Sequence, residues 1–238
     1  RDFDFRLLAI LSGEMSEDQL LQAVDEAVSV HLIEDVPGQM DGYQFAHALI
    51  QQTLAGEVTT SRRVRLHARI AEALEALYGD DAEYHAAELA HHFAESQTTT
   101  GITKLARYSL VAGERALAAH AYEDALTYFE RGLIARDIGL SGTEAAPDEE
   151  AADLLFGLAQ AQSATVGYIR EAFATLSRAF DYYAEAGNIV QAVAAAEFPI
   201  APPLNPMPGL AQLISRALSL VPADSHEAGR LLSRYGGV

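Results

Sequence analysis

One segment of the chain, residues 83–95, concentrates side chains that could bind a metal ion. It carries His85, Glu88, His91 and His92, and a helix would place His85, Glu88 and His92 on one face. Glu88 and His91 have the spacing of carboxylate-bridged di-iron bundles, but such a site needs a second copy of the motif, which the sequence lacks. A His-Glu-x-x-His motif is also absent. We therefore predict no metal site and assign these side chains to polar packing between helices.

Sequence motifs for other kinds of chemistry are missing. The chain contains no Gly-x-x-x-x-Gly-Lys-Ser/Thr phosphate loop, no Gly-x-Gly-x-x-Gly dinucleotide motif and no Gly-x-Ser-x-Gly nucleophile elbow. It has no cysteine, so a thiol nucleophile, a zinc-cysteine site and a disulfide framework are excluded. We predict that this segment has no catalytic residues and is not an enzyme.

The charge of the chain limits its partners. Asp and Glu number 34 against 16 Lys and Arg, which gives a net charge of −18. This charge repels phosphate backbones and anionic membranes, so we expect no direct contact with nucleic acid and none with a membrane. No apolar run approaches the length of a membrane-spanning helix, and the chain begins at Arg1 without a signal peptide. We expect a cytoplasmic protein of which this is one piece.

The pattern of residues 1–58 indicates two helices followed by two strands. Apolar residues from Phe3 to Leu11 precede Gly13, and Ser16 with Gln19 forms a capping box for a second helix. Strands at residues 32–36 and 43–45 flank a Pro-Gly turn. This arrangement suggests a partial winged-helix domain with a small β-wing, whose preceding helix was cut away. The second helix shows carboxylates and no Lys or Arg on its polar face, which argues against DNA binding.

Residues 59–100 are predicted to form a helical hairpin that links this domain to the rest. Thr59-Thr60-Ser61 should cap a helix that ends at Tyr78, and residues 83–95 should form the return helix. Arg62, Arg65 and Arg69 make a basic stripe on the first helix. The stripe is either a solvated face that pairs with nearby carboxylates or a docking face for an acidic surface of another domain.

Small and large residues alternate at helical spacing in residues 113–133. Gly113 and Ala125 let two helices approach closely, and Phe129 fills the space that remains, so we expect Phe129 between the two helices. The pattern resembles a tetratricopeptide repeat over residues 106–139, with Gly132 at a further signature position and with Ala116 and Asp137 departing from the signature. We predict tetratricopeptide-like helical repeats over residues 101–238, in which the last repeat is truncated.

Two segments interrupt these predicted repeats. Residues 141–150 form an acidic linker, and residues 198–209 hold five of the eight prolines of the chain. Proline cannot continue a helix interior, so the second segment should be a bend or an irregular crossing. It is either a rigid connector or the edge of a peptide-binding surface.

The junction Phe45-Ala46-His47-Ala48-Leu49-Ile50 takes the chain from a predicted strand directly into a helix. It resembles the end of the winged-helix module in signal-transduction ATPases of the STAND class, such as LuxR-type regulators and ATPases linked to adenylate cyclases. A Phe-x-His-x-Leu variant of a histidine signature sits there in that family. The resemblance implies that His47 contacts the β-phosphate of ADP, although Ala48 replaces the aspartate of the commoner signature. The other interpretation is that His47 caps the helix or packs in the wing.

The resemblance also implies a function. The chain would be the regulatory and sensor segment of a nucleotide-switched signalling ATPase, possessing no cofactor of its own but serving a parent that binds ATP and ADP. Its partners would be an upstream nucleotide-binding domain and a protein or small-molecule inducer on the repeats, and the open form would self-associate. The alternative is a free-standing tetratricopeptide adaptor that binds a peptide and needs no nucleotide.

Overall fold

The computed structural model describes residues 2–13, 15–96, 102–200 and 208–236. Helices account for 72 % of this part of the chain, which confirms the predicted mostly α-helical fold. The chain divides into two compact units, Arg1–Gly101 and Ile102–Val238, which we describe separately. Within the described ranges, no helix combines the length and apolar character needed to cross a membrane.

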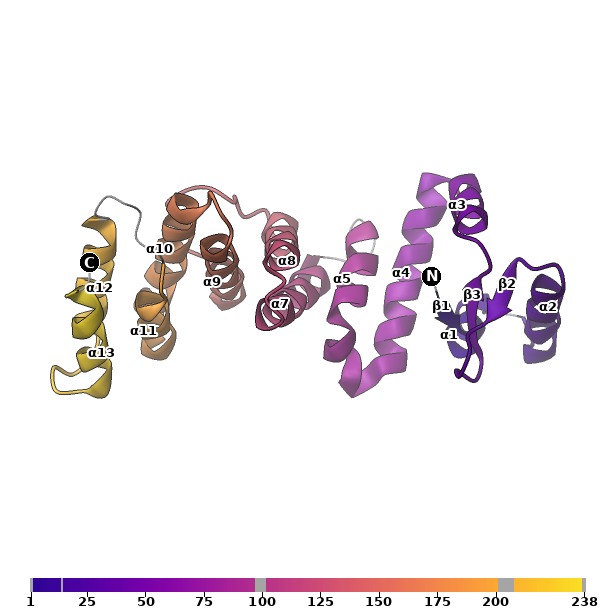
Figure 1. The fold of residues 1–238 in the computed structure, drawn as a ribbon, viewed down its shortest axis with the longest axis horizontal. Helices are drawn as coiled ribbons and strands as arrows, with labels where there is room; N and C mark the ends of the chain where they lie inside the picture. Colours follow the sequence, from indigo (N-terminus) through magenta and orange to yellow (C-terminus); the bar gives the residue numbers. More distant parts are fainter. Residues whose placement is uncertain (1, 14, 97–101, 201–207, 237–238) are drawn as a thin grey trace. The chain divides into compact units, whose positions relative to one another are not determined.

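The first unit opens with a small sheet and two helices. In chain order these elements are β1 (Asp2–Asp4), α1 (Phe5–Ser12), α2 (Glu17–Ser29), β2 (Ile33–Asp35) and β3 (Gly42–Phe45) (Figure 1). The sheet is antiparallel with the order β1-β3-β2, so the first strand lies beside the last. In the middle strand, Tyr43 pairs with Phe3 of β1 on one side and with Asp35 of β2 on the other.

The third strand corrects the sequence prediction, which placed Phe3 in a helix and expected only two strands. The Phe3 ring packs on Tyr43 and Phe45, with centroid separations of 6.0 and 5.9 Å. These cross-strand aromatic contacts, together with backbone pairing to β3, outweigh the local preference for an earlier helix start. The helix begins instead at Phe5, where Asp4 accepts a hydrogen bond from the backbone N–H of Arg6.

The predicted helix signals of this region are otherwise confirmed. Gly13 ends α1 with a φ of 66°, a conformation that glycine adopts without strain. The capping box of α2 is complete, because Ser16 Oγ accepts from the Gln19 N–H and Gln19 Oε1 accepts from the Ser16 N–H. A small core lies between these helices and the sheet: Phe5, Leu20, Val24 and Ile33.

Three helices and a 3-10 helix complete the first unit. They are α3 (Ala48–Glu57), α4 (Thr60–Tyr78), the 3-10 helix η1 (Gly79–His85) and α5 (Ala86–Glu95), and α4 packs against α5. The predicted hairpin is therefore present, but its second α-helix begins at Ala86 rather than at 83. Thr59 occupies the N-cap position of α4 without a side-chain cap, which corrects the predicted capping. No residue of α3 is buried, and its Leu49 is 72 % exposed.

The second unit is a succession of antiparallel helices (Figure 1). They are α7 (Ile102–Ala118), α8 (Tyr122–Ala135), α9 (Glu149–Ala164), α10 (Ile169–Glu185), α11 (Ile189–Glu197), α12 (Pro208–Leu218) and α13 (His226–Tyr235). The most extensive packing is between α7 and α8 and between α9 and α10, and α8 also packs on α9. Successive helices therefore bury their apolar faces against one another.

Phe129 lies at the centre of this packing, as predicted. Its side chain is fully buried, and so are Ala125 and Leu133 on the same helix. A Cβ atom built on Gly113 of α7 would lie 2.6 Å from the phenylalanine ring, and one built on Gly132 would lie 2.7 Å from Leu154 of α9. Glycine is thus required at both positions for the helices to approach this closely.

The acidic linker is held against α10. Arg178 is 5 % exposed, and its guanidinium donates to the carbonyl oxygens of Glu144, at 2.8 Å, and Gly139, at 2.7 Å. At the end of the linker, Asp148 caps α9 by accepting from the Ala151 N–H, and Arg136 pairs with both Asp148 and Glu150. Residues 97–101, at the end of the predicted linking hairpin, and residues 201–207 of the predicted proline-rich bend lie outside the described residues.

Candidate functional site

A groove in the second unit is formed by three helices that alternate with others along the chain. It has a volume of about 220 Å³ and receives side chains from α7, α9 and α11. We call it the repeat groove and define it by the residues that line it: Glu114, Leu117, Asp153, Phe156, Gly157, Gln160 and Gln191. The groove thus combines two carboxylates and two carboxamides with an apolar side.

The polar side of the repeat groove is organised around Asp153. Its carboxylate accepts a hydrogen bond of 2.6 Å from the hydroxyl of Tyr183, whose ring is fully buried in α10. Burial raises the pKa of Asp153, an effect that the Tyr183 hydrogen bond opposes. The pKa of Tyr183 is raised as well, first by its own burial and then by its bond to Asp153, so this hydroxyl stays a donor.

The apolar side of the groove is fixed by aromatic contacts. Phe156 is half-buried and meets Tyr183 edge-on, with a centroid separation of 6.4 Å, and Phe198 at 6.1 Å. At the neighbouring turn, Asn188 Nδ2 donates to Glu149 Oε1 at 3.3 Å, which joins the start of α11 to α9. Because these contacts come from three helices, the walls of the groove depend on the packing of the whole array.

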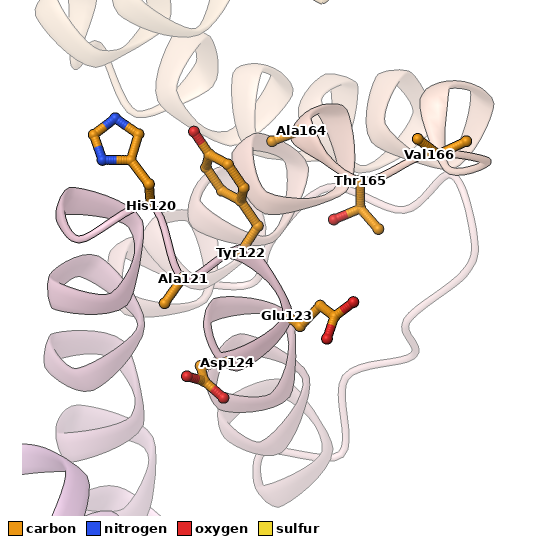
Figure 2. A pocket seen from close by; sticks show the side chains of 8 residues that line it. All are labelled: His120, Ala121, Tyr122, Glu123, Asp124, Ala164, Thr165 and Val166. Atoms are coloured by element: carbon orange, nitrogen blue, oxygen red, sulfur yellow. The ribbon is translucent and has the colours of Figure 1, made fainter.

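A larger pocket of the same unit lies where helices meet their turns (Figure 2). Its volume is about 620 Å³, and it is lined by His120, Ala121, Tyr122, Glu123, Asp124, Ala164, Thr165 and Val166. The rings of His120 and Tyr122 meet edge-on at 6.0 Å, and His120 has a φ of 59°. Val166 is 98 % exposed, so this pocket is wide and shallow rather than enclosed.

The structure separates the histidines that the sequence placed on one helix face. His85 lies in η1, where its ring stacks on Tyr78 at 3.6 Å, and its Nδ1 lies 3.9 Å from Glu88. Glu88 also accepts a 2.8 Å hydrogen bond from the Tyr78 hydroxyl. These three side chains therefore form a local polar cluster, and His92 is not part of it. The predicted grouping is therefore correct for His85 and Glu88 but not for His92.

His92 instead contacts His67, a residue that the sequence analysis missed. Their Nδ1 atoms are 3.0 Å apart across the interface between α4 and α5, and the His91 ring lies 5.2 Å from that of His92. Burial, followed by the neighbouring histidines, lowers the pKa of His92 to about 4. In the part of the chain that the structure describes, no three His, Asp or Glu side chains are grouped to hold a metal ion.

His47 lies at the N-cap position of α3, directly after β3, as the sequence predicted. Its side chain is exposed and makes no capping hydrogen bond. That geometry disagrees with the interpretation of His47 as a helix cap or a packed wing residue, and it leaves the imidazole accessible.

The predicted basic stripe on α4 includes Arg69. Its guanidinium donates a hydrogen bond to the backbone carbonyl of Leu11 within the same unit.

The side chains of the repeat groove were not predicted as site residues. The only signal for Asp153 is a single carboxylate between two residues that are buried, Ala152 and Leu154. Comparison with known proteins adds no family assignment, because no family model, curated protein or solved structure matches the chain.

Proposed function

We propose that the second unit binds a segment of a partner protein in the repeat groove. The observation that carries this proposal is that α7, α9 and α11 all contribute side chains to one groove, which offers both hydrogen-bonding and apolar groups. Peptide segments are recognised by such combinations, since apolar pockets give affinity and a few polar groups fix orientation. Stacked helical repeats use extended surfaces of this kind for binding.

The larger pocket at the turns is a weaker candidate. Carboxylates of Glu123 and Asp124 line it, and its rim includes the fully accessible Val166. A shallow, solvated pocket buries little of a ligand, and charges that remain in water contribute little to binding. The repeat groove is smaller but holds its polar atoms against buried side chains.

We further propose that the chain is the regulatory segment of a nucleotide-switched signalling ATPase. Two features support this context. The first is the order strand, two helices and two strands, with β1 paired to β3, which suits a winged-helix domain. The second is the exposed His47 at the start of α3, where an imidazole could contact the β-phosphate of ADP held by an upstream nucleotide-binding domain. The repeat groove would then receive the protein inducer.

The alternative, a free-standing adaptor, also fits the repeat groove and differs only in needing no nucleotide. In both cases ligand binding acts on a conformational equilibrium only if the ligand prefers one of the two states. The groove and the histidine therefore need separate tests.

For the groove, a random peptide library displayed on phage should be selected against the full chain and then tested on two variants. Gln160→Trp fills the groove, whereas Thr127→Trp adds the same side chain at an exposed position of α8 that does not line it. We expect peptides that bind the wild type and Thr127→Trp but not Gln160→Trp. Peptides that bind all three proteins equally, or a library that yields no binder, would overturn the proposal.

For His47, ADP dissociation should be compared between the parent protein and its His47→Ala variant, together with thermal melts of both. A hydrogen bond to a charged group contributes about 1.5–3 kcal/mol, so its loss should lower the closed-to-open ratio roughly ten- to a hundred-fold. Faster ADP release with an unchanged melting temperature is the expected result. Unchanged release with a lower melting temperature would make His47 a structural residue.

A further inference from the structure

We propose that the repeat groove binds a lysine or arginine side chain of the partner segment and that Asp153 is the charge partner of this cation. The inference rests on the proposed function and deepens it, because it names the chemistry of the ligand. It follows from four properties of the groove: the burial of Asp153, the charge of its surroundings, the apolar wall and the size of the space.

Asp153 is a half-buried carboxylate, and no cationic side chain among the described residues pairs with it. Its polar partner in the structure is the Tyr183 hydroxyl, which stabilises one oxygen at 2.6 Å. Removing a carboxylate from water is costly unless a charged or hydrogen-bonding partner compensates for the lost hydration, and a single neutral hydroxyl compensates for only part of it. An incoming cation would supply the missing compensation.

The surroundings of Asp153 add negative charge rather than neutralising it. Glu149, on the same helix, raises the pKa of Asp153 by electrostatic repulsion. None of the described residues that line the groove is Lys, Arg or His. An acidic peptide would therefore meet like charges at close range, whereas a basic one meets complementary charge.

The remaining walls suit the aliphatic part of a basic side chain. Leu117 and Phe156 provide the apolar surface, and the carboxamides of Gln160 and Gln191 can accept further hydrogen bonds. Lysine and arginine bury their methylene groups along apolar surface while the charged end reaches a polar partner. The face of Phe156 adds a cation–π contribution if the charged group lies over it. The volume of about 220 Å³ accommodates one such side chain.

The test uses peptides that lose binding with Gln160→Trp. In each peptide, every arginine is replaced by citrulline and every lysine by acetyl-lysine, which remove the charge but keep most of the shape. Affinities are measured by calorimetry for the wild type and for Asp153→Asn, which keeps the size of the side chain. Asp224→Asn is the matched control, because it makes the same change in net charge at an exposed position outside the groove.

We expect one basic position whose neutralisation weakens binding about tenfold or more, as removal of one member of a partly buried charge pair does. Asp153→Asn should cause a similar loss, and the neutral peptide should bind this variant no more weakly than the wild type. Asp224→Asn should bind like the wild type, and circular dichroism should show that both variants remain folded. Tyr183→Phe, which removes the hydroxyl that holds the carboxylate, should weaken binding of the charged peptide more than that of the neutral one.

Groove-dependent peptides whose affinity is unaffected by neutralisation would overturn this inference and leave the proposed function standing. Equal losses in Asp153→Asn and Asp224→Asn would also overturn it, because the effect would then come from net charge alone. A library without any groove-dependent binder removes the proposed function, and this inference with it.

Discussion

The ring of Phe129 on α8 lies directly against the backbone of Gly157 on α9. A Cβ atom added to Gly157 would lie 2.3 Å from both Cε1 and Cζ of the phenylalanine, closer than such atoms approach in folded proteins. The same ring also lies against Gly113 of α7, so one side chain contacts both neighbouring helices. Gly157 also lines the repeat groove, which ties the shape of the groove to this packing.

Gly157→Ala should therefore destabilise the protein, although alanine favours a helix. The added methyl group must displace a fully buried ring, and such overpacking costs about 1–3 kcal/mol, against a helix-propensity gain of about 1 kcal/mol. We expect a net loss of up to about 2 kcal/mol in urea unfolding. Gly229→Ala on α13 is the control, because no atom lies within 4 Å of its added Cβ and the substitution should stabilise the helix. Equal effects at the two sites would contradict the close approach.

Phe129→Ala should cost about 3–5 kcal/mol, the usual range for removal of a buried aromatic side chain. In the double variant with Gly157→Ala, the two losses should not add, because the alanine methyl group then occupies space that the ring has left. Urea unfolding of the two single variants and the double variant measures this coupling. A loss under about 1 kcal/mol for Phe129→Ala would mean that the ring is not buried between these helices.

Arg178→Met should release the acidic linker from α10. The substitution keeps the aliphatic length but leaves the carbonyl oxygens of Glu144 and Gly139 without their donor. Hydrogen bonds to charged groups contribute about 1.5–3 kcal/mol each, so we expect the loss of both to cost roughly 3–6 kcal/mol. Limited proteolysis should also cut residues 139–148 sooner. Arg170→Met, at an exposed position of the same helix, should change neither measurement appreciably.

Acidification should weaken the packing of α4 on α5. The pKa of His92 is lowered from 6.5 to about 4 by burial, so the unfolded chain takes up a proton in this range while the folded chain does not. The folded state consequently loses stability as the pH falls from about 6.5 towards 4, and the lowered pKa of His67 acts in the same direction.

Thermal melts across this pH range test the prediction. His92→Gln keeps a hydrogen-bonding side chain without the titration, so its melting temperature should fall less steeply than that of the wild type. His226→Gln replaces an exposed histidine and should follow the wild type. If the melting temperatures of the wild type and of His92→Gln fall equally with pH, the contact between His67 and His92 does not contribute to the acid sensitivity.

Much of the helical architecture follows from local sequence signals. The capping box of Ser16 and Gln19, the end of α1 at Gly13 and the helix pair around Phe129 were all predicted correctly, because each depends on residues close together in the chain. The change from β3 to α3 around His47 belongs to the same class, since a strand followed by a helix needs only neighbouring residues to specify it.

Tertiary packing alone decided which distant side chains meet. Phe3 lies in a strand because its ring packs on an aromatic side chain of β3. His92 contacts His67 of α4 rather than the residues with which the sequence grouped it. Asp153 is a candidate site residue only in the folded chain, because the packing of α10 on α9 brings Tyr183 to it from 30 positions away in the sequence. Helical periodicity states which face of a helix is apolar, but the rotation and contact of helices depend on how all the buried side chains fit together, and the repeat groove is a product of that fit.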